Sequence, residues 1–375
     1  MIDIFKAQVK EIIYRDMYIS KFRVEINSML YNCINYEMLT GSVEVNDTVL
    51  LNTTAVELGL GSGGYHYVLA NLSKDSFSNI GHGHIMKLRY TPMQINCMAA
   101  EAQESPYHNI FNDFESLKGL PVISGTLHSM LAPIALTLKH IAGKERIVYI
   151  MTDGGALPIW MSETVKRLRS SGVLHGAITF GNAFGGDLEC INVYTALIAA
   201  KEIMKADAAV ITMGPGIAGT GTRYGFSGIE QGYIVDAVNN IGGKAIAVPR
   251  ISFADSRSRH YGLSHHTMMT LGKLCCTKAL IALPILEKSK DDLIRKQLEE
   301  SGVMSRHRLI RLDSADVEKL LETEKRQLER MGKSFSQDKE YFITCGISAL
   351  LAKNSCLLYT SDAADDLLCV ILGGP

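Results

Sequence analysis

Acidic and imidazole side chains follow several apolar runs of this chain, in loops that also contain glycine. Asp153, for example, stands just after the apolar run 146–151 and directly before two glycines. Carboxylates that converge on one site can bind a divalent cation together with substrate phosphates, or exchange protons with a substrate. The residues that we expect to act in this way are Asp153, Asp187, Glu189, His128 and His265.

Two groupings could hold a metal ion. Asp153, Asp187 and Asp255 supply carboxylate oxygens, which are the ligands that Mg²⁺ prefers. All three also precede segments expected to be helical or to turn, where an aspartate commonly caps the backbone instead. His82 and His84 would share one face of an extended segment and could bind one metal, although a solvated loop is the favoured interpretation. The sequence leaves these alternatives open.

The segment 214–223 is rich in glycine and directly follows the apolar run 208–213. Glycine permits positive φ and lets a ligand come close to main-chain N–H groups. We therefore predict that this loop holds an anionic group of a ligand, with an arginine as counter-charge. The expected contacts are Gly214, Gly216, Gly219, Gly221, Thr222, Arg223 and, further along the chain, Glu230.

The same loop matches the glycine spacing of the dinucleotide fingerprint, but three observations disfavour NAD(P). The loop follows the fourth apolar run of its region, whereas the fingerprint follows the first strand. It continues as loop beyond Gly219, where a helix should begin. The next apolar run ends in Pro249 and Arg250, where an acid is expected. A cradle for a phosphate or carboxylate group fits the segment better.

The elements that must position these residues alternate between apolar strands and helices, which predicts an α/β domain with a doubly wound, mainly parallel, Rossmann-like sheet. We expect strands at 120–124, 146–151, 177–180, 208–213 and 244–249, and helices near 129–142, 158–171, 190–204, 229–241 and 265–279. The candidate residues all follow predicted strands, whereas the segments before the strands contain no comparable set of candidate residues. Ligands of such sheets bind beyond the carboxyl ends of the strands, so we predict one shared site there.

Residues 1–95 show short alternating segments separated by turn residues, which predicts a small β-barrel or sandwich. A connection at 96–119 leads to the α/β ligand-binding domain at 120–287. The charged part at 288–355 is expected to be helical and could support a homo-oligomer. Residues 356–375 resemble translated read-through of a sequencing adapter, and we expect them to be foreign to the protein.

Composition excludes several classes of protein. The 375 residues are 47% hydrophobic and carry a net charge of −1, so no overall field attracts nucleic acid or a membrane surface. We see neither a signal peptide nor an apolar run long enough to cross a membrane. The eight cysteines form no C-x-x-C pair. These features predict a cytoplasmic protein with reduced thiols and no nucleic-acid or membrane partner.

Several long motifs are similar to those of one bacterial family. They lie at 52–61, 83–92, 104–108, 125–131, 152–158, 214–223, 228–232 and 251–267. Over about residues 5–350 the chain resembles the bacterial domain-of-unknown-function 3866 family. That family has no assigned activity, so the resemblance implies a cytoplasmic bacterial setting and no mechanism.

Two classes of function are consistent with these observations. The first is an enzyme that acts on a small anionic metabolite at the carboxyl edge of the sheet; a phosphorylated metabolite and a metal-assisted hydrolase or transferase reaction are among the possibilities. The alternative is a nucleotide- or metabolite-sensing or scaffold protein without turnover. Ligand-dependent melting followed by turnover assays separates them, because both classes bind but only the first converts its ligand.

Overall fold

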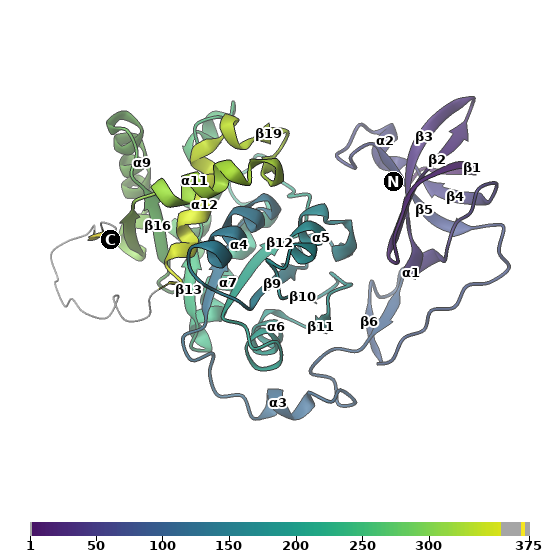
Figure 1. Cartoon of the computed structure of the whole chain (residues 1–375), viewed down its shortest axis with the longest axis horizontal. Helices are drawn as coiled ribbons and strands as arrows, with labels where there is room; N and C mark the ends of the chain where they lie inside the picture. The colour runs from purple at the N-terminus through teal and green to yellow at the C-terminus, as the bar shows by residue number, and fades with distance from the viewer. Residues whose placement is uncertain (1, 354–368, 372–375) are drawn as a thin grey trace. The chain divides into compact units, whose positions relative to one another are not determined.

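The computed structural model describes residues 2–353 and 369–371 and divides the chain into two units (Figure 1). The first unit ends at Met98 and the second begins at Ala99. Within the described residues no helix is long and apolar enough to cross a membrane. The predicted read-through at 356–375 falls almost wholly outside the described residues; only its strand β20 (Cys369–Ile371) lies within them.

The first unit contains a closed five-stranded barrel, which decides between the barrel and the sandwich expected for this region. Its strands follow the order β1-β2-β3-β5-β4, and β3 and β5 close it as a parallel pair. Alternate side chains such as Phe22 and Val24 point inward and form the barrel core. The bounds are β1 (Ile4–Arg15), β2 (Ile19–Ile26), β3 (Met29–Tyr36), α1 (Glu37–Thr40), β4 (Thr48–Asn52), α2 (Thr54–Glu57), β5 (Tyr65–Asn71), β6 (Ile85–Lys87) and β7 (Ile95–Cys97).

The second unit is built on a sheet in which every pair of neighbouring strands is parallel. This arrangement confirms the predicted α/β class. In the described part of the chain the order is β11-β10-β9-β12-β8-β13-β16-β17-β20. The remaining bounds are β8 (Pro121–Ser124), β9 (Ile147–Thr152), β10 (Gly176–Phe180), β11 (Leu188–Cys190), β12 (Ala208–Met213), β13 (Lys244–Ala247), β16 (Leu280–Pro284) and β17 (Arg308–Leu312).

Strands β11, β16 and β17 were not predicted from the sequence. Residues 288–355 were expected to be helical, yet β17 lies within them and pairs with β16 along five residues. Arg308 and Arg311 interrupt the apolar pattern of β17, so the segment resembles its charged helical neighbours in composition. Pairing with a buried strand places it in the sheet despite those charges.

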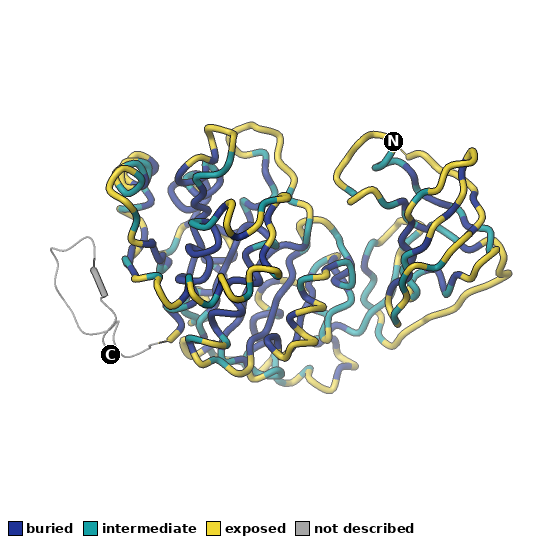
Figure 2. Tube along the Cα trace, turned by 45° about the horizontal axis from the view of Figure 1, so that its top comes forward, coloured by how far each residue is buried: buried dark blue, intermediate teal, exposed yellow. Residues whose placement is uncertain are grey.

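Helices cover both faces of this sheet, and Figure 2 shows its strands as buried stretches between exposed connections. Successive side chains of one strand alternate between the two faces: Tyr149 packs into one core, whereas Val148 and Ile150 pack into the other. The first core is covered by α4 (Leu131–His140), α5 (Glu163–Ser170), α11 (Ala315–Thr323) and α12 (Lys339–Leu350). The second is covered by α6 (Val193–Ile198), α7 (Glu230–Asn240), α9 (Lys288–Ser301) and α10 (Val303–Arg306).

Short elements complete the second unit. Helix α8 (His265–Met269) continues into a π-helical turn at Thr270–Leu274, and α6 continues likewise at Ala199–Ile203. The others are α3 (His108–Asn112), β14 (Ile251–Ser252), β15 (Gly262–Leu263), β18 (Glu329–Arg330) and β19 (Lys333–Ser334).

Gly346 lets α12 pack closely against its neighbours. A Cβ at this position would lie 2.5 Å from Val317 Cγ1 of α11 and 3.0 Å from Thr137 Oγ1 of α4. We expect Gly346→Ala to lower the free energy of unfolding by about 1–2 kcal/mol, because overpacking outweighs the higher helix propensity of alanine. Urea unfolding measures the change. Gly61→Ala is the control, since a Cβ there would meet no atom within 4 Å; equal losses in both variants would contradict the packing argument.

Candidate functional site

The neighbouring strands β9 and β12 end where the chain leaves the sheet in opposite directions. After β9 the chain passes to α5 on one face and on to β10, whereas after β12 it passes to α7 on the other face and on to β13. The loops at 153–162 and 214–229 therefore diverge from adjacent strand ends. In parallel α/β sheets, ligands commonly bind at the carboxyl edge beside such a divergence.

Glu230, the first residue of α7, is the most perturbed acid beside this divergence. Its side chain is buried with 5% exposure. The Thr152 hydroxyl donates a hydrogen bond of 2.6 Å to Oε1, and the Tyr233 hydroxyl donates one of 3.4 Å to Oε2. The pKa of Glu230 is raised to about 7, chiefly by burial; the two hydroxyl donors lower it, and the nearby charge of Asp153 makes a smaller contribution that raises it. Near neutral pH this carboxyl group therefore both gains and loses a proton readily.

Asp153 lies at the end of β9, next to Glu230. Its Oδ2 accepts a hydrogen bond of 3.2 Å from the Asn182 side chain, while its buried Oδ1 has no partner among the described residues. The following residue, Gly154, passes so close to Met213 and to the Glu230 carboxyl group that a Cβ there would clash with Met213 Cε. The Asp153 carboxyl group lies against Gly181 and Asn182 after β10, and its charge acts on the Glu230 carboxyl group at the start of α7.

The glycine-rich segment after β12 folds back on itself as a hairpin-like loop. Thr220 N–H donates a hydrogen bond of 2.8 Å to Gly225 O, and Gly225 N–H donates one of 3.1 Å to Thr222 Oγ1. Gly216 and Gly221 have φ of 103° and 79°, which L side chains rarely adopt. Residues 218–224 are exposed. The loop projects from the edge as an exposed segment with both of these glycines at turning points.

Two arginines accompany the loop. Arg223 is exposed and stacks over the Tyr224 ring at 5.3 Å. Arg259 approaches from a different segment, and its Nη1 would lie 2.8 Å from a Cβ at Gly221. Arg223 was predicted from the sequence as a contact of the ligand, whereas Arg259 was not predicted as a partner of the loop. Both guanidinium groups are placed to attract an anion.

His128 opens the turn before α4 and is held by its neighbours. Its Nδ1 lies 3.2 Å from the Tyr149 hydroxyl and 3.3 Å from Met213 O. Its Nε2 lies 2.7 Å from Ser162 Oγ, and Ser162 in turn caps α5. Burial lowers the pKa of His128 to about 4, so the ring is neutral at pH 7. With both nitrogens engaged, His128 joins α4, β12 and α5.

The structure does not bring Asp187 to the shared edge, whereas Glu189 lies opposite Thr179, near the carboxyl end of β10. Strand β11 returns beside β10 in parallel after a short loop, and this return carries Asp187 to the amino end of β10. There Asp187 accepts hydrogen bonds from Ala177 N–H, at 2.8 Å, and from Arg169, at 2.7 Å. Glu189 accepts hydrogen bonds from Thr179 Oγ1 and from Gly185 N–H, each of 2.6 Å, and closes the loop. The sequence could not reveal a parallel return without a helix.

Asp255 is surrounded by arginines. It pairs with Arg250 and Arg330 at 3.1 Å each and with Arg257 at 2.9 Å. Hydrogen bonds from Arg257 lower the pKa of Asp255 far below its ordinary value. The three proposed metal ligands Asp153, Asp187 and Asp255 therefore have separate environments. Across residues 2–353 and 369–371 no three histidine, cysteine, aspartate or glutamate side chains form a group that could hold a metal ion. His82 and His84 are exposed before β6.

The chain matches the family described as "Protein of unknown function (DUF3866)" over residues 32–349. This chain is a DUF3866 protein. The match confirms the resemblance inferred from the long motifs, and it covers most of the chain, including the whole of β8 to β17. A comparison with curated proteins found no match.

In this DUF3866 protein, buried polar atoms without partners concentrate near the ends of β8 and β13. Gln231, beside Glu230 on α7, donates hydrogen bonds to Ser124 O and Val248 O and leaves its own Oε1 unpartnered. The His266 ring stacks on Phe226 at 4.0 Å. The buried atoms concerned, none with a hydrogen-bond partner in the described structure, are Ser124 Oγ, Thr126 Oγ1, Gln231 Oε1, Arg250 Nε, His265 Nε2, His266 Nδ1 and Thr270 Oγ1.

Of these residues the sequence analysis had identified only His265 as a site residue. Unpartnered buried polar groups are uncommon in folded proteins and call for a physical explanation, such as a ligand or an ordered water. Gln231 directly follows Glu230 in the chain, and Thr152 directly precedes Asp153. Gln231 and Thr152 could have been predicted from the sequence because each is adjacent to a residue predicted for the site. Strand ends and helix starts place consecutive residues at the same edge of the sheet.

Proposed function

We propose that this protein is a cytoplasmic enzyme that transfers a proton to or from a small anionic metabolite at the carboxyl ends of β9 and β12. The observation that carries the proposal is the pair of Glu230 and Asp153 at the point where the chain leaves the sheet in opposite directions. Burial and the Asp153 charge keep the Glu230 pKa at about 7. General acid–base catalysts are most effective when their pKa lies near the working pH.

The roles follow from position. Glu230 exchanges the proton, and Thr152 and Tyr233 orient its carboxyl group through their hydroxyl donors. The negative charge of Asp153 helps to raise the pKa of Glu230. Asp153 also offers its unpartnered Oδ1 to the ligand. Arg223 and Arg259, with the exposed loop between β12 and α7, attract the anionic part of the ligand. A phosphorylated or carboxylated substrate of a hydrolase or transferase meets these requirements.

The cytoplasmic assignment is supported by the thiols. Six cysteines within residues 2–353 are free, namely Cys33, Cys97, Cys190, Cys275, Cys276 and Cys345. Proteins of oxidising compartments commonly join such residues in disulfides.

The proposal is tested by melting the protein in the presence of phosphorylated and carboxylated metabolites, with and without Mg²⁺, and by assaying turnover of those that stabilise it. We expect Glu230→Gln to retain ligand-dependent stabilisation and to lower turnover by about 10²–10⁴-fold, the usual contribution of general acid–base catalysis. In the wild type the rate should change with an apparent pKa near 7, and this dependence should be lost in the variant.

Glu299→Gln provides the control, because Glu299 is an exposed acid on α9 whose partner is Arg295. It should turn the substrate over at the wild-type rate. A Glu230→Gln protein that keeps both the rate and the pH profile of the wild type would show that Glu230 is not the proton-transfer group.

A further inference from the structure

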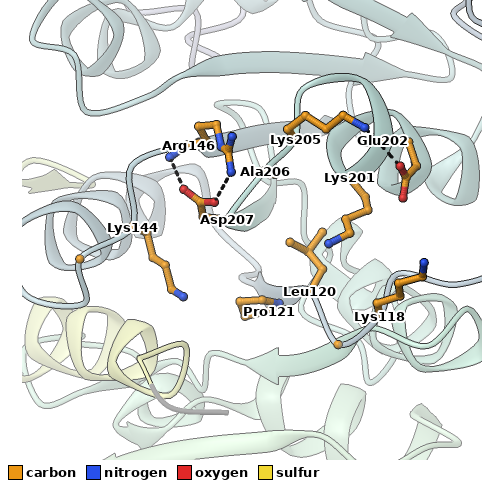
Figure 3. Close-up of a pocket in the computed structure, with 12 residues that line it drawn as sticks. Lys118, Leu120, Pro121, Lys144, Arg146, Lys201, Glu202, Lys205, Ala206 and Asp207 are labelled. Atoms are coloured by element: carbon orange, nitrogen blue, oxygen red, sulfur yellow. Dashed lines mark hydrogen bonds and ion pairs between the residues drawn. The ribbon is translucent and has the colours of Figure 1, made fainter.

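A basic pocket lies at the amino ends of the central strands, at the opposite end of the sheet from Glu230. Its volume is about 720 Å³, and it opens where β8, β9 and β12 begin (Figure 3). Because amino and carboxyl ends of parallel strands lie at opposite edges, this pocket is separate from the site described above. Its cationic lining residues are Lys118, Lys144, Arg146, Lys201 and Lys205.

Positive charge exceeds negative charge in the lining. Five cations face two acids, Glu202 and Asp207, so the lining carries 5 − 2 = 3 positive charges in excess. Arg146 pairs with Asp207 at 2.8 Å, and Lys205 pairs with Glu202 at 3.4 Å.

The three remaining cations are Lys118, Lys144 and Lys201. Within residues 2–353 and 369–371 their ammonium groups have no hydrogen bond or ion pair. Figure 3 shows Lys144 and Lys201 extending from opposite sides of the pocket, with Leu120 and Pro121 between them.

The positive field extends beyond the pocket to Lys244, which begins β13. Burial lowers the pKa of Lys244, and the charges of Lys144 and Arg308 lower it further. A lowered lysine pKa means that an added positive charge is unfavourable at this edge. An anion placed among the lysines would relieve that repulsion.

Helix ends account for only part of this charge. Lys201 and Lys205 lie in or next to the π-helical end of α6, where the helix dipole favours cations. Lys118 and Lys144 lie in loops, and Arg146 directly precedes β9. The dipole therefore does not explain why cations from separate segments converge on one hollow.

We propose that this pocket binds a small molecule through a polyphosphate group, either free or carried by a nucleoside. Three unpaired ammonium groups balance the three or four negative charges of a diphosphate or triphosphate. Lysine attracts phosphate as a mobile point charge, without the fixed bidentate geometry of arginine. The volume falls within the range of about 300–1,000 Å³ that is usual for small-molecule sites, so it leaves room beside the phosphates.

Calorimetric titration of sodium tripolyphosphate into the full chain at low ionic strength tests the proposal. We expect the wild type to bind and Lys144→Glu/Lys201→Glu to bind at least about tenfold more weakly, because two phosphate contacts become repulsive. The matched control is Lys273→Glu/Lys319→Glu, which makes the same change of charge at two exposed lysines outside the lining. It should bind as the wild type does.

Further titrations identify the source of the phosphates. If adenosine triphosphate binds more tightly than tripolyphosphate, the ligand is a nucleotide; if the two affinities are equal, only the polyphosphate group is recognised. Either result supports the proposal, provided that Lys144→Glu/Lys201→Glu binds more weakly than the wild type. Equal binding by the pocket variant and the wild type would overturn it, and so would an equal loss in both double variants. The Glu230→Gln variant should bind tripolyphosphate as the wild type does. If the enzyme proposal fails, these titrations therefore still decide whether the basic pocket binds polyphosphate.

Discussion

Replacement of Glu230 by glutamine is expected to stabilise the protein at pH 8 by about 3 kcal/mol while it lowers the proposed activity by about 10²–10⁴-fold. The Glu230 pKa is about 7 in the folded protein, against an ordinary value of 4.5. The folded state therefore binds more protons than the unfolded state between these two values. Stability falls as the pH rises through this window, and above pH 7 the loss is complete. Glutamine keeps the neutral form at every pH and avoids the loss.

Urea unfolding at pH 5 and at pH 8 measures this difference. Trp160, the only tryptophan of the chain, belongs to the second unit, so its fluorescence follows the unit that contains Glu230. The stabilising effect of Glu230→Gln should be small at pH 5 and large at pH 8. Glu299→Gln, at an exposed site, should change stability by less than about 1 kcal/mol at both values. A stabilisation independent of pH would show that the carboxyl group titrates normally.

Replacement of Arg330 by methionine is expected to lower the free energy of unfolding by about 3–5 kcal/mol. The Arg330 side chain is 2% exposed and pairs with Asp338, which is fully buried, and with Asp255. Its guanidinium group also lies over the Tyr341 ring, 4.4 Å from the centroid. Removal of Arg330 leaves the buried carboxylate of Asp338 without its positively charged partner. A buried charge that has lost its partner is strongly destabilising.

A double-mutant cycle separates the lost ion pair from the lost packing. Asp338→Leu combined with Arg330→Met should destabilise by less than the sum of the two single changes, since neither charge of that pair then remains buried. Lys325→Met is the matched control, because Lys325 forms an exposed pair with Glu322 and should change stability by less than about 1 kcal/mol. Strict additivity in the cycle would mean that the pair itself contributes nothing.

The two arginine-rich regions of the second unit differ in their degree of burial. Arg250 and Arg330 are enclosed with Asp255 and Asp338, and this network ties the segment after β13 to the start of α12. Arg223 and Arg259 are exposed beside the glycine-rich loop. The first set is suited to holding the fold together and the second to meeting a charged ligand.

Local patterns in the sequence predicted five strands of the α/β unit, namely β8, β9, β10, β12 and β13. Continuous apolar runs such as 146–151 and 208–213 can be buried on both sides only as inner strands of a parallel sheet, and glycine-rich loops mark their ends. The same reasoning placed Asp153 and the loop at 214–223 after strands. It failed for β17, whose arginines conceal a strand that is fixed by pairing with β16.

Tertiary structure alone decided which of the candidate residues meet. Insertion of β12 between β9 and β8 brings Glu230 beside Asp153, although 77 residues separate them in the chain. The helix-free return of β11 carries Asp187 to the opposite edge. Strand order depends on long-range packing of helices on the two faces, which local periodicity does not encode. The sequence by itself therefore predicted a site at the strand ends, and the order of the strands is the basis of our proposal that it centres on Glu230 and Asp153.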